Sequence, residues 1–214
     1  MIIYLSLLIL ALVFAAQLLK LKWQKIKILS LAKWALIISV TAVFIYWTYL
    51  TYAQYIAWRD GGPPLSYFVP PYKSPLYVIG YHFIRFGLYY LLSLAASLVF
   101  LVWTKRANRR FGYRFFEDEE PYLGALAIFL LGFPELRFAW LYYLILFFSV
   151  YLFIHLFLIA RFYLIKRKSL INTDKKLINT DKKPLIDTDK HPRVPMYYLW
   201  LPLAILVILI KMVV

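Results

Sequence analysis

Long apolar runs constrain the fold of this chain more than any other feature. They cover about residues 2–19, 32–57, 76–103, 122–133, 138–165 and 196–214. A helix that crosses a bilayer needs about 20 predominantly apolar residues, with a range of about 17–25. The chain is 64% hydrophobic, with a mean hydropathy of +0.71, whereas soluble domains use roughly 45–50% apolar residues. The sequence therefore predicts an all-α, polytopic integral membrane helix bundle with about six transmembrane helices.

The fourth apolar run, residues 122–133, is shorter than the others. It would form only about 18 Å of helix at 1.5 Å per residue, whereas the hydrocarbon core is about 30 Å thick. The segment is therefore either a thin crossing extended by its flanks or a re-entrant helix. The first run is followed by Lys20, Lys22, Lys25 and Lys27 rather than by an A-x-A-like cleavage site, so we expect it to be retained as a helix.

A basic segment with an internal repeat separates the last apolar run from the others. LINTDKK occurs at Leu170–Lys176 and again at Leu177–Lys183, and LIDTDK follows at Leu185–Lys190. Two adjacent apolar positions followed by Asn-Thr-Asp make no coiled-coil seam, which favours a flexible or loosely turned linker. The expected organisation is a transmembrane bundle over residues 1–165, this linker over 166–195, and a C-terminal transmembrane helix over 196–214.

Positive charge is concentrated in three segments between the runs. Of the 25 Lys and Arg residues, 20 fall within residues 20–33, 105–114 and 161–193. Cytoplasmic segments near helix ends carry the excess of Lys and Arg. If residues 122–133 cross the membrane, all three segments share one face, so we expect six crossings, a plasma (inner) membrane location and a cytoplasmic basic face. A re-entrant helix would put the third segment on the other face.

The net charge of +15 is confined to short segments beside apolar runs. This distribution favours anionic lipid headgroups over nucleic acid, at about 1 kcal/mol per cation near the surface. We expect the bilayer and other membrane proteins as partners. The cations expected to contact lipid or partner are Lys105, Arg106, Arg109, Arg110, Lys166, Arg167 and Lys168. The chain has no cysteine, which excludes disulfides and Cys-based metal sites.

An acidic run, Glu117, Asp118, Glu119 and Glu120, precedes Pro121 before the fourth apolar run. Proline is favoured in the first turn of a helix. Carboxylates there interact favourably with exposed N–H groups and the helix dipole, by about 0.3–1 kcal/mol each. Helix capping and pairing with the arginines of the preceding basic segment explain the run locally. A ligand, partner or catalytic role for Asp118 and Glu120 is the alternative.

The segment from Glu120 to Gly132, EPYLGALAIFLLG, resembles the helix that follows the G-x-G-D motif of the prepilin peptidases, which are membrane aspartic proteases. The resemblance would place Glu120 at the position of a catalytic aspartate, although acidic residues replace the motif's Gly-x-Gly and Tyr122 stands where lysine is frequent. Such proteases need a second carboxylate that shares a proton with the first. Asp60 is the upstream candidate, and the expected topology puts it on the other side of the membrane. The resemblance implies a divergent or degenerate relative.

His82, Arg85 and His155 are ionisable residues that lie within the apolar runs. His82 and Arg85 share one face of the third helix, and ionisable groups inside a span are candidates for a ligand or ion pathway. Both lie near the interface, where arginine can snorkel, so anchoring is the alternative. His155 lies deeper and has no visible partner of the kind a metal site requires, which favours a neutral histidine. No P-loop, dinucleotide-binding, nucleophile-elbow or HExxH motif is present, so we expect no metal and no cofactor.

These observations support three functions. We expect a non-catalytic structural or assembly subunit of a membrane complex. A small transporter or channel is the first alternative, with a pathway formed by the interrupted helix at 122–133 and by the loop Asp60–Pro75, which has five prolines and two glycines. A prepilin-peptidase-like protease that uses Glu120 or Asp118 is the second alternative. The absence of catalytic motifs favours a protein that is not an enzyme.

Overall fold

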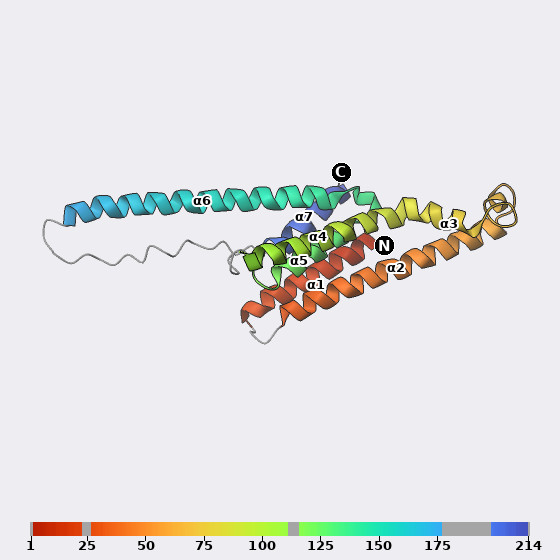
Figure 1. The fold of residues 1–214 in the computed structure, drawn as a ribbon, viewed down its shortest axis with the longest axis horizontal. Helices are drawn as coiled ribbons and strands as arrows, with labels where there is room; N and C mark the ends of the chain where they lie inside the picture. The colour runs from red at the N-terminus through yellow and green to blue at the C-terminus, as the bar shows by residue number, and fades with distance from the viewer. Residues whose placement is uncertain (1, 23–26, 111–115, 177–197, 214) are drawn as a thin grey trace.

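The computed structural model describes residues 2–22, 27–110, 116–176 and 198–213, and of residues 2, 21, 22 and 162–176 it describes the backbone only. These parts form an all-α bundle of mostly antiparallel helices without strands (Figure 1). The elements are α1 (Ile2–Lys22), α2 (Ile28–Asp60), η1 (Leu65–Phe68), α3 (Pro75–His82), the π-helical turn η2 (Phe83–Gly87), α4 (Leu88–Arg110), α5 (Glu120–Leu130), η3 (Pro134–Leu136), α6 (Ala139–Lys176) and α7 (Trp200–Val213).

Among the described residues, four helical segments are long and apolar enough to cross a membrane. They are Ile3–Lys20, Ile28–Asp60, Pro75–Arg110 and Ala139–Arg161. The third of them joins α3, η2 and α4 into one helical rod. The helices α5 and α7 are apolar but shorter. The predicted all-α helical bundle is therefore confirmed, and its membrane character follows from the length and composition of these four segments.

The short helix α5 lies at the centre of the bundle. Its apolar side chains from Leu123 to Leu131 are each at most 2% exposed, as expected for a helix that is hydrophobic on every side. Small residues of α4 allow close packing, since Ser97 Oγ donates a hydrogen bond of 2.8 Å to the Ala125 carbonyl. A Cβ atom on Gly132 would lie 1.9 Å from Ser93 Oγ. Small side chains at such contacts let membrane helices approach one another.

The chain through α5 and the turn after it runs from one end of α4 to the other. The chain enters α5 beside the end of α4, where Asn108 binds the Phe116 backbone. It leaves at the far end, where Phe138 contacts Tyr89 with 5.7 Å between ring centroids. From there α6 runs back past the end of α4 (Figure 1). We call the end where α1 and α4 finish and α2, α5 and α7 begin the basic end; it carries Lys20, Lys33 and Lys105.

The structure differs from the expected linker at its start. Residues 166–176, including the first LINTDKK copy, continue α6 as a helix that extends well beyond the bundle (Figure 1). Extending an existing helix adds one hydrogen bond per residue without a new nucleation step, which offsets the weak propensity of Asn-Thr-Asp. The later repeat copies lie outside the described residues. The last helix begins at Trp200 and carries Pro202 in its first turn, where proline is tolerated.

At the opposite end, α2 and α3 extend past the other helices and are joined by the loop of residues 61–74 (Figure 1). We call this part, residues 47–83, the aromatic arm. Trp58 is its centre and packs against Phe68, Tyr77 and Tyr81, with ring centroids 5.3, 6.1 and 5.1 Å away. Ser74 caps α3 by accepting a hydrogen bond from the Leu76 N–H, with Pro75 at the first helical position. The proline-rich loop contains one short helical turn, η1.

Candidate functional site

Polar side chains from four helices meet at the first turns of α5. Lys20 of α1 forms an ion pair with Glu119, with 2.6 Å between Nζ and Oε1. Lys105 of α4 donates a hydrogen bond of 2.5 Å to the Tyr122 hydroxyl and lies 4.2 Å from the centroid of that ring. Lys33 of α2 lies 5.0 Å from the same centroid. We call these five residues the lysine–tyrosine cluster.

Glu120 lies beside this cluster and is 2% exposed. Its Oε2 accepts a hydrogen bond of 3.1 Å from the Glu117 N–H, in the turn that precedes α5. Glu120 precedes the apolar part of α5 and lies outside the four membrane-length segments. Burial raises the pKa of the Glu120 carboxyl to about 8, against the opposing effect of the Glu117 N–H. A carboxyl group in this position is largely protonated at neutral pH.

The rest of the acidic run divides between exposed and paired groups. Glu117 and Asp118 are exposed, and Asp118 has no described partner. Arg109 and Arg110 are exposed and form no ion pair among the described residues, whereas Glu119 pairs with Lys20. Arg106 is also exposed at this end, whereas Arg114 and the side chains of Lys166, Arg167 and Lys168 lie outside the described residues.

Asn108 holds the segment before α5 against α4, and no sequence pattern singled it out. Its Nδ2 donates a hydrogen bond of 2.8 Å to the Phe116 carbonyl, and its Oδ1 accepts one of 3.2 Å from the Phe116 N–H. Lys33 and Tyr122 were also missed as members of one site. Lys33 lies at the start of the second apolar run, and Tyr122 lies just after Pro121. These positions identify two helix ends, but they do not show that the two ends are neighbours.

Asp60 and Glu120 lie at opposite ends of the bundle. Lys33 contacts the Tyr122 ring at one end of α2, and Asp60 is the last residue of the same helix. At 1.5 Å per residue the distance between these two positions is roughly 40 Å. Asp60 is exposed and pairs with its neighbour Arg59 at 2.7 Å. The two carboxyl groups cannot share a proton in this arrangement, which argues against the dyad of an aspartic protease.

The structure does not bring His82, Arg85 and His155 together at one site. His82 and Arg85 lie at the start of the π-helical turn, where the Arg85 guanidinium lies 4.9 Å from the Tyr81 ring centroid. His82 meets the same ring edge-on at 5.4 Å. His155 stacks on Tyr151 in α6, with 5.8 Å between ring centroids. In the described part of the chain, no three His, Asp or Glu side chains are grouped so that they could hold a metal ion.

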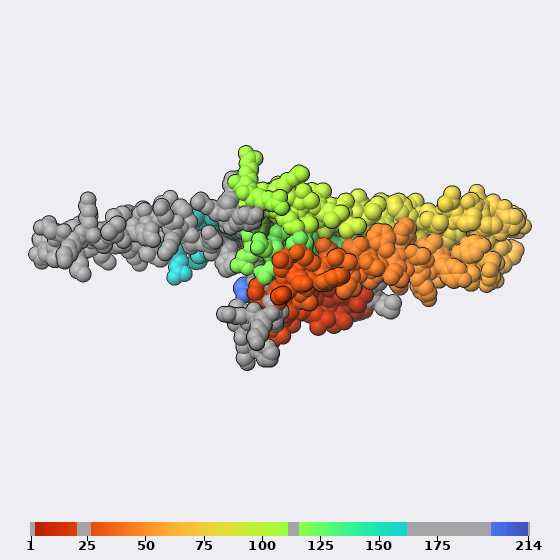
Figure 2. Space-filling view, turned by 60° about the horizontal axis from the view of Figure 1, so that its bottom comes forward, coloured from red at the N-terminus to blue at the C-terminus, as the bar shows by residue number. Residues whose placement is uncertain are grey.

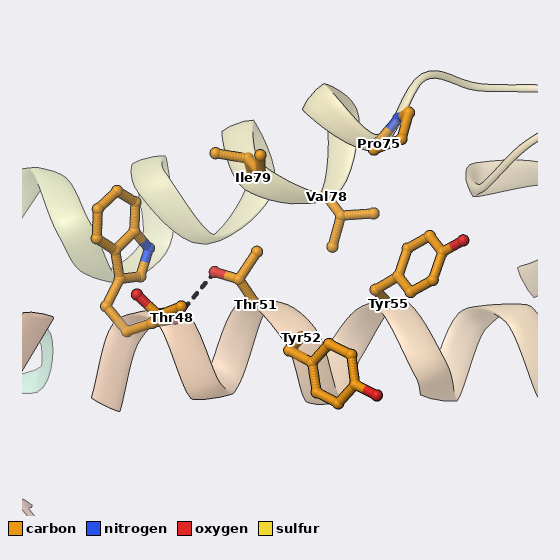
Figure 3. A pocket seen from close by; sticks show the side chains of 8 residues that line it. Thr48, Thr51, Tyr52, Tyr55, Pro75, Val78 and Ile79 are labelled. Atoms are coloured by element: carbon orange, nitrogen blue, oxygen red, sulfur yellow. Dashed lines mark hydrogen bonds between the residues drawn. The ribbon is translucent and has the colours of Figure 1, made fainter. Parts of the chain in front are cut away.

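A concave groove lies in the aromatic arm, between α2 and α3 (Figure 3). It encloses about 340 Å³ and is lined by Trp47, Thr48, Thr51, Tyr52, Tyr55, Pro75, Val78 and Ile79. The hydroxyls of Thr48 and Thr51 donate to carbonyls of their own helix, at 3.0 and 2.9 Å. The groove therefore presents mainly apolar and aromatic surface, without an acid, base or nucleophile arranged for catalysis.

Comparison of the chain with protein-family models, with curated proteins and with solved structures finds no match in any of the three. Its class is defined by its own structure. It is an all-helical bundle with four membrane-length helices, a buried central helix and a cluster of lysines at one end.

Proposed function

We propose that this chain is a non-catalytic structural or assembly subunit of a membrane complex, which binds neighbouring membrane proteins through the outer face of α6. The observation that carries the proposal is how little of α6 the chain itself covers. Only 11% of its membrane-length window is buried, against 22–28% for the other three segments. Its uncovered side chains include Leu152, Phe153, Leu156 and Phe157.

The inner face of α6 is occupied by packing within the chain. Phe147 stacks on Trp200 of α7, with 3.6 Å between ring centroids. The Tyr143 hydroxyl donates a hydrogen bond of 3.0 Å to the Trp200 carbonyl. Because these contacts fix the orientation of α6, its aromatic outer face points away from the bundle. Association of helices in a membrane depends on close packing and hydrogen bonds, and aromatic side chains offer large contact areas.

The packing of α5 argues against a transporter or channel. The positions of the carboxyl groups argue against a protease of the prepilin-peptidase type. A transporter or channel needs a pathway through the bundle, whereas the centre is filled by the buried side chains from Leu123 to Leu131. A protease of the prepilin-peptidase type needs two neighbouring carboxyl groups, whereas Asp60 and Glu120 are far apart. A structural role requires neither a pathway nor a dyad.

We also propose how the chain is oriented in the membrane. Lys20, Lys33 and Lys105 lie at the basic end, and α6 extends beyond that end with the first part of the third basic segment, residues 161–176. With an excess of Lys and Arg on the cytoplasmic side, the basic end faces the cytoplasm of a plasma (inner) membrane and contacts anionic lipid headgroups. The four long helices, α7 and the apolar part of α5 then make six crossings.

Photocrosslinking tests the proposal directly. A photoreactive phenylalanine analogue placed at Phe153, which is 71% exposed, is compared in cells with the same analogue at Ile45 of α2, which is 65% exposed. We expect the α6 probe to give one recurrent adduct with another membrane polypeptide that also copurifies with the chain, and the α2 probe to give lipid adducts. The double variant Phe153→Ala/Phe157→Ala should lose the copurification. Lipid adducts alone at both positions would refute the proposed interface.

A further inference from the structure

We propose that Lys33, Lys105 and Tyr122 bind the phosphate group of an anionic phospholipid at the basic end. This inference rests on the proposed membrane location of the chain and adds to it a defined lipid site. The two lysines come from α2 and α4, which are separated in sequence, and both reach the ring of Tyr122 on α5. An anion held here would therefore contact three helices at once.

The two ammonium groups have no carboxylate partner in the described part of the chain. Its ion pairs are Lys20–Glu119 and Arg59–Asp60. Glu119 is therefore engaged by a different lysine, and Glu120, the acidic residue nearest to Tyr122 in sequence, is buried and accepts a hydrogen bond from the Glu117 N–H. Two cations beside one aromatic ring repel each other, and an anion between them would remove that repulsion.

The hydrogen-bonding capacity of the site suits a phosphate group. The Tyr122 hydroxyl accepts a hydrogen bond from Lys105, so its own proton can be donated to an anion. Each lysine has three N–H donors, and Lys105 uses one of them on Tyr122. Hydrogen bonds from charged donors to phosphate oxygens are about twice as strong as those between neutral groups. All three residues are partly exposed, so a headgroup can reach them.

Neighbouring tryptophans indicate that the site lies at headgroup depth. Trp34 follows Lys33 directly and Trp103 lies two residues before Lys105, and both indole rings are exposed. Exposed tryptophans of membrane proteins concentrate at the membrane–water interface. In Figure 2, green atoms from the α5 part of the chain reach the surface between orange α2 and yellow-green α4 at this end. A lipid phosphate is therefore favoured over phosphate from solution.

The test measures the thermal stability of the detergent-purified full chain against added phosphatidylglycerol, phosphatidylcholine or inorganic phosphate. Phosphatidylglycerol should raise Tm with a saturable dose response, and the other two should not. The double variant Lys33→Gln/Lys105→Gln should weaken the apparent affinity for phosphatidylglycerol by about tenfold or more, given about 1 kcal/mol per cation. Tyr122→Phe, which removes only the hydroxyl, should weaken it by a smaller factor.

A matched control separates a site from general attraction. Lys27→Gln/Lys73→Gln removes the same charge from exposed positions outside the site and should change the affinity by less than about twofold. Lys33→Arg/Lys105→Arg should retain binding, which also covers the case in which the glutamine variant fails to fold. Equal losses in both glutamine variants, loss of binding in the arginine variant, or equal stabilisation by inorganic phosphate would overturn the proposal. The Phe153 crosslink should be unaffected, so failure of the lipid site and failure of the subunit role are distinguishable.

Discussion

The two ends of the bundle are held together by different kinds of contact. At the basic end, polar side chains join helices that are far apart in sequence, as in Lys20–Glu119 and Lys105–Tyr122. In the aromatic arm, α2 and α3 are joined mainly by aromatic packing around Trp58. The arm therefore forms a local hairpin, whereas the basic end determines how distant helices are placed.

Buried polar atoms do not separate the two ends, whereas the size of the apolar core does. Trp47 Nε1 and His82 Nε2 in the arm, and Trp200 Nε1 at the basic end, are buried without a hydrogen-bond partner among the described residues. The buried core of the arm consists of Trp58, Val69 and Val78, whereas a much larger buried core surrounds α5. Regions with few buried apolar contacts open more easily. We therefore expect the arm to open more readily than the bundle around α5.

The largest expected effect comes from removing one tryptophan at each end. Trp200 is fully buried against Phe147 and Phe100, so Trp200→Ala should lower the free energy of unfolding by about 3–5 kcal/mol. Trp58→Ala removes a ring of the same size, yet we expect its effect to stay within the arm. Chemical unfolding in detergent measures the loss of unfolding free energy in Trp200→Ala. Hydrogen exchange by mass spectrometry shows whether the effect of Trp58→Ala stays within the arm.

Hydrogen exchange also decides whether the arm is independent. In Trp58→Ala, exchange should rise over residues 61–81 while the amides of α5 keep their protection. In Trp200→Ala, exchange should rise in α5 and α6 together. If Trp58→Ala raises hydrogen exchange in α5 as much as in the arm, the two ends form one cooperative unit. The proposed independence of the arm is then wrong.

The sequence predicted the helices better than the site because the two depend on different information. Apolar run length identifies a helix such as α2, whose observed bounds extend the expected 32–57 by a few residues at each end. The lysine–tyrosine cluster instead depends on which helix ends become neighbours, and no local pattern links Lys33 with Tyr122. The helical start of the repeat segment was missed because propensity was judged without the preceding helix.

The stability of the fold should also depend on pH through the Glu120 carboxyl group. Because its pKa in the folded chain is about 8 and that of an unfolded glutamate is about 4.3, the folded state binds more protons between these values. Stability should therefore be greatest near pH 4–5 and fall as pH rises toward 8, by at most about 1.4 kcal/mol per pH unit. Glu120→Gln keeps an oxygen for the Glu117 N–H and should remove this slope. Unfolding curves between pH 5 and 8 measure it, and an unchanged slope in the variant would assign the effect to another group.

The smallest expected effect tests whether the polar contacts of the basic end stabilise the fold or mainly fix its geometry. The side chains of Lys20 and Glu119 are 33% and 16% exposed, and ion pairs in such positions contribute up to about 1 kcal/mol. Glu119→Gln should therefore cost less than Trp200→Ala by a factor of several, and the cost should shrink at high salt. Asp60→Asn, which breaks the fully exposed pair of the arm, should produce no measurable change. A loss for Glu119→Gln as large as that for Trp200→Ala would mean that this ion pair, rather than packing around α5, holds the basic end together.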